Sequence, residues 1–133
     1  MTKEFQPKFN SVMIIDDSEI DLYLASHIIA KNKFSKKILQ YQSAQDALDF
    51  LHKNHQNIIA LPDVIFVDIY MPLMSGFEFM EAYDKLPVSL KSHCRVFVVS
   101  STIDERDINR IRSDKNISAF FEKPLKKELL QTI

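Results

Sequence analysis

Short apolar runs, each about the length of a β-strand, alternate along the chain with amphipathic segments. Runs that are apolar on both faces are typical of buried parallel strands, and their alternation with helices is typical of βαβ units. The pattern therefore predicts an α/β domain in which helices cover both faces of a mostly parallel sheet. The strands are predicted at residues 11–15, 37–41, 64–68, 95–100 and 119–122.

Helix starts are indicated by a Ser or Thr followed three residues later by an acid, the capping-box pattern. The helix after the fourth strand has only three isoleucines to bury, so we expect it to lie loosely on the sheet, as a switch element does. A short last helix is predicted at residues 125–133. The four boxes are Ser18 with Asp21, Ser43 with Asp46, Ser75 with Glu78, and Thr102 with Glu105.

Composition and charge exclude several classes of protein. The 133 residues, 46% hydrophobic and 26% charged, fit one folded domain. No apolar run is long enough to span a bilayer and no secretory signal is present, so we expect a cytoplasmic protein without membrane contact. A net charge of −1 gives no indication of a surface for nucleic-acid phosphates. Cys94 is the only cysteine and is interpreted as a packing residue.

Glycine content excludes the common nucleotide-binding loops. Walker A and Rossmann turns need several glycines, and Gly76 is the only glycine of the chain. A flavodoxin-type FMN site needs a hydroxyl-rich loop after the first strand, where this chain has Asp16, Asp17, Ser18 and Glu19. Such an acidic loop repels phosphate unless a cation lies between them.

Several polar residues follow the predicted strands at their carboxyl ends, where open parallel sheets bind ligands. Asp16 and Asp17 follow the first strand, Asp68 ends the third, Ser100 ends the fourth, and Lys123 follows the fifth. Clustered carboxylates repel one another unless a cation is present. Oxygen ligands favour a hard ion, and an incomplete carboxylate set favours Mg²⁺. The set predicts a magnesium-assisted phosphoryl site with Asp68 as the nucleophile.

These residues resemble the response-regulator receiver domains of two-component signalling, in the stand-alone, chemotaxis-regulator-like type. The resemblance implies a flavodoxin-like, doubly wound five-stranded parallel sheet of order 2-1-3-4-5 with helices on both faces. It implies one receiver domain over residues 1–133, with residues 1–9 as an N-terminal extension and no output domain. The matching motifs are residues 12–17 (VMIIDD), 64–72 (VIFVDIYMP) with Gly76, 96–101 (VFVVSS) and 120–124 (FFEKP).

The resemblance also implies a role for each matching residue. Asp17 would bind Mg²⁺ directly and Asp16 through water, and the carbonyl of Tyr70 would complete the protein ligands. Asp68 would be the phosphoacceptor. The remaining assignments are Ser100 as the switch hydroxyl, Lys123 as the ammonium that pairs with the phosphoryl group, Phe120 as the aromatic rotamer switch, and Pro124 after an often cis peptide bond.

The chain departs from the family pattern at a few positions. Ser stands at 100 where Thr is commoner, Phe stands at 120 where Tyr is frequent, and the first and third strands are more widely spaced than usual. None of these changes removes a chemical role. In this family Tyr70 and Thr102 occupy positions that tune the access of the hydrolytic water, and we expect bulky Tyr70 to lengthen the lifetime of the phosphoryl group.

The functional prediction is a phosphorelay switch rather than an enzyme. A histidine kinase or a histidine phosphotransfer protein would be the donor. The fourth predicted helix, the fifth strand and the last helix would engage a downstream protein or a second copy of the chain. The alternatives are a degenerate receiver that binds its partner constitutively and a phosphatase with an aspartyl-phosphate intermediate. Taken alone, each motif has an ordinary structural explanation, and His52 with His55 is interpreted as a surface pair rather than a metal site.

Overall fold

Five parallel strands form a single sheet in the order β2-β1-β3-β4-β5. The computed structural model describes residues 6–101 and 103–133. The observed order confirms the predicted flavodoxin-like arrangement. The strands are β1 (Phe9–Ile15), β2 (Ser35–Tyr41), β3 (Val64–Val67), β4 (Arg95–Ser100) and β5 (Ile117–Glu122).

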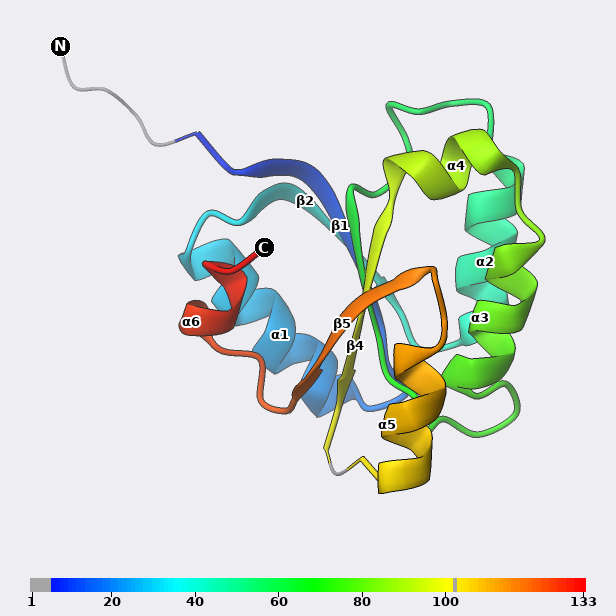
Figure 1. Cartoon of the computed structure of the whole chain (residues 1–133). Helices are drawn as coiled ribbons and strands as arrows, with labels where there is room; N and C mark the ends of the chain where they lie inside the picture. Colours follow the sequence, from blue (N-terminus) through cyan, green and yellow to red (C-terminus); the bar gives the residue numbers. More distant parts are fainter. Residues whose placement is uncertain (1–5, 102) are drawn as a thin grey trace, which may run out of the picture.

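Helices cover both faces of this sheet, which gives three layers (Figure 1). Helices α1 and α6 lie on one face, and α2, α3, α4 and α5 lie on the other. The helices are α1 (Glu19–Lys31), α2 (Ala44–Lys53), α3 (Gly76–Asp84), α4 (Val88–His93), α5 (Glu105–Arg112) and α6 (Lys127–Leu130). The predicted covering of both faces is therefore confirmed.

Serine caps start three of the predicted helices. The hydroxyls of Ser18, Ser43 and Ser75 each accept a hydrogen bond from the backbone N–H three residues later. The fourth capping box is wrong, because the N-cap of α5 is Asp104, whose carboxylate accepts from the backbone N–H of Arg106 at 2.8 Å. Thr102 itself lies outside the described residues.

Several element boundaries differ from the sequence-based prediction. Helix α4 was not predicted, because it is six residues long and its N-cap, Pro87, makes no side-chain hydrogen bond; the fully buried Leu90 anchors it. The last helix is shorter than residues 125–133 and covers only Lys127–Leu130. Strand β1 starts two residues early, since Phe9 pairs with Ser35 and packs edge-on against Phe34.

The core divides into two clusters, one under each helical layer. Alternate residues of β1 contribute to each: Met13 and Ile15 to the larger cluster beneath α2 to α5, and Val12 and Ile14 to the smaller one beneath α1 and α6. The burial of every β3 side chain explains its continuous apolar run. The larger cluster includes Cys94, and burial raises the pKa of its thiol to about 12.

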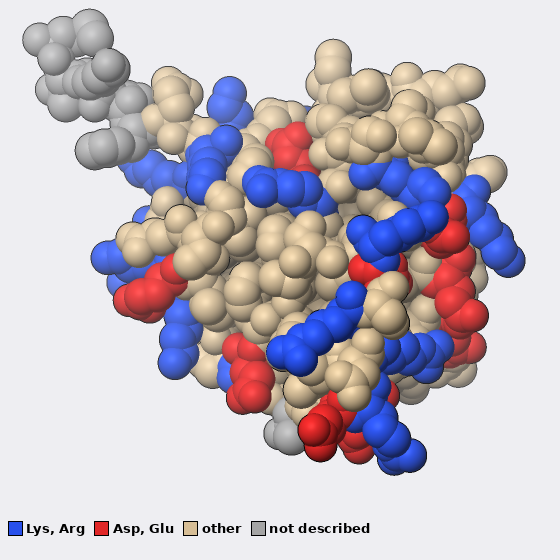
Figure 2. Space-filling model, in the orientation of Figure 1, with Lys and Arg blue, Asp and Glu red and all other residues tan. Residues whose placement is uncertain are grey.

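The surface carries charges of both signs. On the face shown in Figure 2, acidic atoms lie mainly toward the right edge and the lower end, while basic atoms are scattered over much of the rest. Among the described residues, no helix is both long and apolar enough to cross a membrane. The single domain over residues 1–133 and the extension over residues 1–9 stay predictions.

Candidate functional site

Two buried aspartates lie side by side at the carboxyl edge of the sheet. Asp16 directly follows β1 and Asp68 directly follows β3, and the last residues of these neighbouring strands, Ile15 and Val67, are paired in register. The backbone N–H of Asp68 donates to the carbonyl of Ile15 at 3.0 Å. Asp16 is 4% exposed and Asp68 is 7% exposed, so both carboxylates are largely removed from water.

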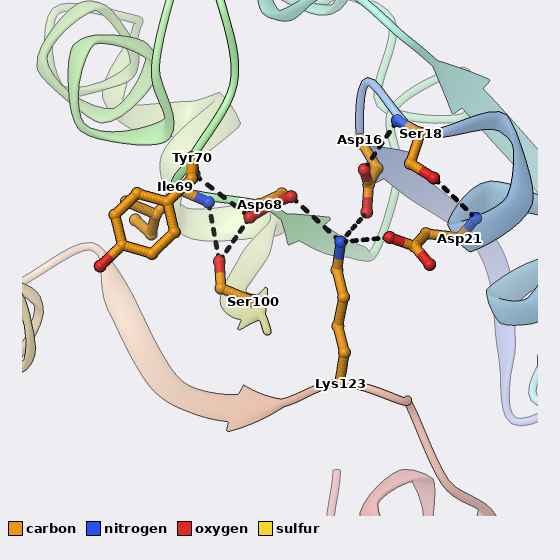
Figure 3. Close-up of polar contacts among 8 residues, drawn as sticks. All are labelled: Asp16, Ser18, Asp21, Asp68, Ile69, Tyr70, Ser100 and Lys123. Carbon is orange, nitrogen blue, oxygen red and sulfur yellow. Dashed lines mark hydrogen bonds and ion pairs between the residues drawn. The ribbon is translucent and has the colours of Figure 1, made fainter. Parts of the chain in front are cut away.

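Lys123 brings its ammonium group into this acidic cluster from the other side (Figure 3). Its Nζ lies 2.6 Å from an oxygen of Asp16 and 3.0 Å from Oδ2 of Asp68. The side chain starts just after β5, where the backbone N–H of Lys123 donates to the carbonyl of Ser100 at 2.8 Å. The peptide bond from Lys123 to Pro124 is cis. One ammonium group thus neutralises part of the charge of the cluster.

Ser100 contacts the oxygen of Asp68 that Lys123 leaves free. Its hydroxyl donates to Oδ1 of Asp68 at 2.5 Å and accepts from the backbone N–H of Ile69 at 2.9 Å. The backbone N–H of Tyr70 also donates to Oδ1, at 3.2 Å. Ser100 is fully buried. Because Ser100 donates to one oxygen of Asp68 and Lys123 to the other, each oxygen faces an oriented donor. Such an arrangement can stabilise negative charge that develops at this position.

Burial and charge act in opposite directions on the pKa values of Asp16 and Lys123. Burial is the main reason that the pKa of Asp16 is raised, although hydrogen bonds from Lys123 and from the backbone of Ser18 act against it. Burial alone would lower the pKa of Lys123, but its hydrogen bonds to Asp16, Asp21 and Asp68 outweigh that effect and raise it. Lys123 therefore keeps its positive charge in this cluster.

Asp21 belongs to the site although sequence reasoning assigned it only to a helix cap. Its backbone N–H does donate to Ser18 at 3.2 Å, but its carboxylate accepts from Nζ of Lys123 at 2.8 Å. The backbone N–H of Ser18 donates instead to Asp16, at 3.0 Å. An acid in the first turn of a helix that follows an acidic strand end is a signal for such a role, because that turn faces the same edge of the sheet.

The acidic cluster fits a hard divalent cation. Carboxylate oxygens of Asp16, Asp17 and Asp68 all lie within 4.8 Å of one another, and Asp17 is exposed to solvent. The ammonium group of Lys123 contacts Asp16, Asp68 and Asp21, so one positive charge faces several carboxylates and excess negative charge remains. Oxygen-only donors with open positions suit Mg²⁺. Among the described residues this is the only such cluster, and His52 and His55 belong to none.

The remaining predicted site residues lie outside this cluster. Tyr70 is 46% exposed, and its ring points away from the carboxylate of Asp68 (Figure 3). Phe120 is half-buried against the larger core cluster, and the guanidinium of Arg112 lies 5.6 Å from the centre of its ring. The structure therefore brings Asp16, Asp17, Asp68, Ser100 and Lys123 together, with Tyr70 and Phe120 at the periphery.

A cavity of about 230 Å³ adjoins the carboxylates between α1 and the segment that follows β5. Asp68 and Lys123 line its polar end, and Leu24, Val99 and Leu125 are among its apolar lining residues. The cavity therefore lies directly against the acceptor residue and its ammonium partner.

The only glycine lies against the backbone of the loop that carries Asp68. A Cβ atom at Gly76 would lie 2.5 Å from the carbonyl oxygen of Asp68 and 2.7 Å from Cα of Ile69. The N–H of Gly76 donates to the carbonyl of Ile69 at 2.8 Å. The capping box of Ser75 and Glu78 is complete and holds the start of α3 at this point. Gly76 thus positions the acceptor loop, a function that sequence reasoning missed.

The chain belongs to the family of response regulator receiver domains, whose family model matches residues 12–133. Members of this family are signalling modules of two-component systems rather than conventional enzymes. The sequence-based resemblance is confirmed by this match and by the fold.

Individual relatives agree with this assignment. The polar-differentiation response regulator DivK of Brucella ovis is 30% identical over 115 residues, which are 86% of this chain and 85% of that protein. A response regulator receiver protein from Dyadobacter fermentans is 33% identical, with a TM-score of 0.82 and 92% of each chain covered. A two-component response regulator from Cytophaga hutchinsonii has a TM-score of 0.87 at 26% identity, covering 94% of this chain and 93% of its own.

Replacing Gly76 by Ala tests the close approach at the acceptor loop. Helix propensity alone predicts a gain in stability for this change at a helix start. The contact with the backbone of Asp68 and Ile69 predicts the opposite, a loss of about 1–3 kcal/mol in the free energy of unfolding, typical of overpacking. Urea denaturation of Gly76→Ala, with Glu81→Ala on the exposed side of α3 as the control, measures the difference. A stability equal to or above that of the wild type would contradict the account.

Proposed function

We propose that the protein is a phosphoacceptor switch in which Asp68 receives a phosphoryl group. The observation that carries this proposal is the engagement of both oxygens of Asp68. Ser100 donates to Oδ1 at 2.5 Å and Lys123 donates to Oδ2 at 3.0 Å, in a site that is open to a cavity. Family membership gives independent support for a role in two-component signalling.

The transfer step uses a phosphohistidine donor on a histidine kinase or a histidine phosphotransfer protein. A carboxylate oxygen of Asp68 attacks phosphorus, the N–P bond of the donor breaks, and the donor imidazole keeps the electron pair and takes up a proton. Lys123 is close enough to pair with a phosphoryl oxygen, because its Nζ already lies 3.0 Å from Asp68. Ser100 can turn its hydroxyl from the carboxylate toward the new group.

Asp16, Asp17 and Asp68, with the carbonyl of Tyr70, would hold Mg²⁺ beside the acceptor. A bound Mg²⁺ supplies positive charge that offsets the negative charge of the transferring phosphoryl group. The three carboxylates that lie within 4.8 Å of one another provide the oxygen donors for it. Without Mg²⁺, the ammonium group of Lys123 is the positive charge that Asp16 and Asp68 share, since its Nζ contacts both.

Phosphorylation changes the surface through local contacts. The added group draws Ser100 and Lys123 toward its oxygens, and Phe120 moves into the space that opens behind Ser100. The face that responds consists of α5, β5 and α6, which correspond to the fourth predicted helix, the fifth strand and the last predicted helix. A downstream protein, or a second copy of the chain, would bind this face in one state and not in the other.

Two other functions are less well supported by the site. A constitutive binding module has no need for the full set of acceptor, hydroxyl and ammonium, and here the hydroxyl and the ammonium each lie within hydrogen-bond distance of the acceptor carboxylate. A phosphatase would normally have a second acid two residues after the nucleophile, where this chain has Tyr70. Turnover of a phosphoester would distinguish the phosphatase from the switch. A cytoplasmic location without direct contact with nucleic acid or membrane fits the switch and stays a prediction.

The switch predicts one labile phosphoryl adduct on the intact chain. Incubation with acetyl phosphate and Mg²⁺ should add a single phosphoryl mass, and Asp68→Asn should abolish it because the amide cannot attack phosphorus. A chelator should suppress the adduct in the wild type. Intact mass spectrometry gives the result directly.

The matched control for this experiment is Asp63→Asn, which changes an aspartate at the opposite end of β3. Asp63 accepts hydrogen bonds from the backbone of Asn10 and Ser11 and has no contact with the acidic cluster. The fraction of Asp63→Asn that carries the phosphoryl adduct should equal that of the wild type. An adduct that persists in Asp68→Asn, or the absence of any adduct, would refute the proposal.

Tyr70 should lengthen the lifetime of the phosphoryl group by restricting the approach of water. In Tyr70→Ala the side chain no longer restricts water on this side of the acceptor loop, so we expect dephosphorylation to be faster. The measurement is the loss of the adduct with time after the phosphodonor is removed. Tyr23→Ala, which removes an exposed tyrosine of α1, is the control. Equal rates in wild type and Tyr70→Ala would exclude the shielding role.

A further inference from the structure

Tyr70 links the loop that carries the acceptor to the first turn of α5. Its hydroxyl donates to Oδ2 of Asp107 at 2.6 Å and accepts from the backbone N–H of Asp104 at 3.3 Å. At its other end, the backbone N–H of Tyr70 lies 3.2 Å from Oδ1 of Asp68. A continuous chain of contacts therefore runs from the acceptor carboxylate to the start of α5.

The bond to Asp107 is the strong part of this chain. Its length is typical of a hydroxyl that donates to an ionised carboxylate, a class stronger than neutral hydrogen bonds. The same contact with Asp107 is the main reason that the pKa of the Tyr70 phenol is raised. With 46% of Tyr70 exposed, water competes for the bond, so it can open and close.

Helix α5 has few other attachments. Within the helix only Ile111 is buried, while Ile108 is partly buried and Ile103 packs just before the helix start. The guanidinium of Arg110 lies 4.0 Å from the centre of the ring of Phe77, a partly buried residue of α3. An element with so little buried apolar surface can be moved by the gain or loss of a single strong contact.

We propose that Asp107 is a positioning residue that fixes the Tyr70 ring between the acceptor loop and the first turn of α5, at the periphery of the site, and thereby couples the lifetime of the phosphoryl group to the position of α5. This inference rests on the proposed phosphorylation of Asp68. In the dephosphorylation step, water attacks phosphorus, the bond from phosphorus to the carboxylate oxygen breaks, and inorganic phosphate leaves the restored carboxylate of Asp68. While Tyr70 is held by Asp107, its ring restricts the approach of this water.

The coupling gives a binding partner control over the signal. A protein that binds α5 and displaces its first turn separates Asp107 from Tyr70, which frees the ring and shortens the lifetime. A protein that binds α5 in its present position keeps the contact between Asp107 and Tyr70 and prolongs the lifetime of the phosphoryl group. The partner would thus affect the acceptor without contacting it.

Lifetimes of the phosphorylated chain test this inference, using protein loaded with acetyl phosphate and then freed of it. Tyr70→Phe and Asp107→Ala each remove the bond that holds the ring but keep an aromatic ring at position 70. Each should shorten the lifetime by roughly threefold to tenfold, because water competes for this exposed bond and reduces its net strength to that of an ordinary hydrogen bond. The double variant should lose its phosphoryl group no faster than either single variant, because the two substitutions remove the same bond. Asp107→Asn keeps an acceptor oxygen and should recover most of the wild-type lifetime.

A control and a second readout separate positioning from a general effect on the helix. Glu105→Gln removes an exposed acid from the same first turn and should keep the wild-type lifetime. Amide hydrogen exchange over residues 105–112 of the unphosphorylated chain should be faster in Tyr70→Phe and Asp107→Ala than in Glu105→Gln, a difference that needs no phosphorylation.

The possible outcomes distinguish this inference from the proposed function. A wild type that forms no adduct overturns both. A normal adduct whose lifetime is unchanged or longer in Asp107→Ala overturns the coupling alone and leaves the phosphoacceptor intact. Additive effects in the double variant also overturn the coupling, because Tyr70 and Asp107 would then act independently.

Discussion

The ammonium group of Lys123 holds the acidic end of the sheet together. It contacts Asp16, Asp21 and Asp68 at 2.6–3.0 Å, and it thereby joins the end of β1 and the start of α1 to the end of β3, which is far away in the sequence. Without a counter-charge, buried carboxylates at this spacing repel one another strongly. The same arrangement makes the site responsive, because a divalent cation or a phosphoryl group changes the charge balance that Lys123 now maintains. Electrostatic repulsion between the carboxylates makes this cluster costly to assemble, and the same repulsion makes it respond to an added charge.

Parallel strands explain why such distant residues meet. The carboxyl ends of β1, β3, β4 and β5 lie at one edge, so the residues that end or follow these strands are neighbours whatever their distance along the chain. Gly76 lets the loop after β3 approach the start of α3, and the fully buried Ser100 fixes one oxygen of Asp68. Helix α5 has one buried residue of its own and contacts this edge through Tyr70.

Much of this arrangement could be predicted from the sequence, because strand ends and helix caps are local signals. Asp16, Asp68, Ser100 and Lys123 follow from strand boundaries alone. Contacts that depend on side-chain direction could not be predicted, namely the turn of Asp21 toward Lys123 and the pairing of Tyr70 with Asp107. The close approach of the Gly76 backbone to the acceptor loop could not be predicted either, because it depends on how two backbone segments pack. Helix α4 was missed because its N-cap, Pro87, makes no side-chain hydrogen bond, and the start of α5 was misplaced because Asp104 rather than Thr102 caps it.

The most direct test of the central claim is chemical location of the phosphoryl group. Borohydride reduces an acyl phosphate on aspartate to the alcohol, which leaves homoserine at the modified position. Digestion and peptide mass spectrometry of the freshly phosphorylated and reduced chain then identify that position. The account predicts homoserine at position 68 and unmodified aspartates at 16, 17 and 21. Homoserine at any of those three positions instead, or a phosphoryl group that resists reduction, would contradict it.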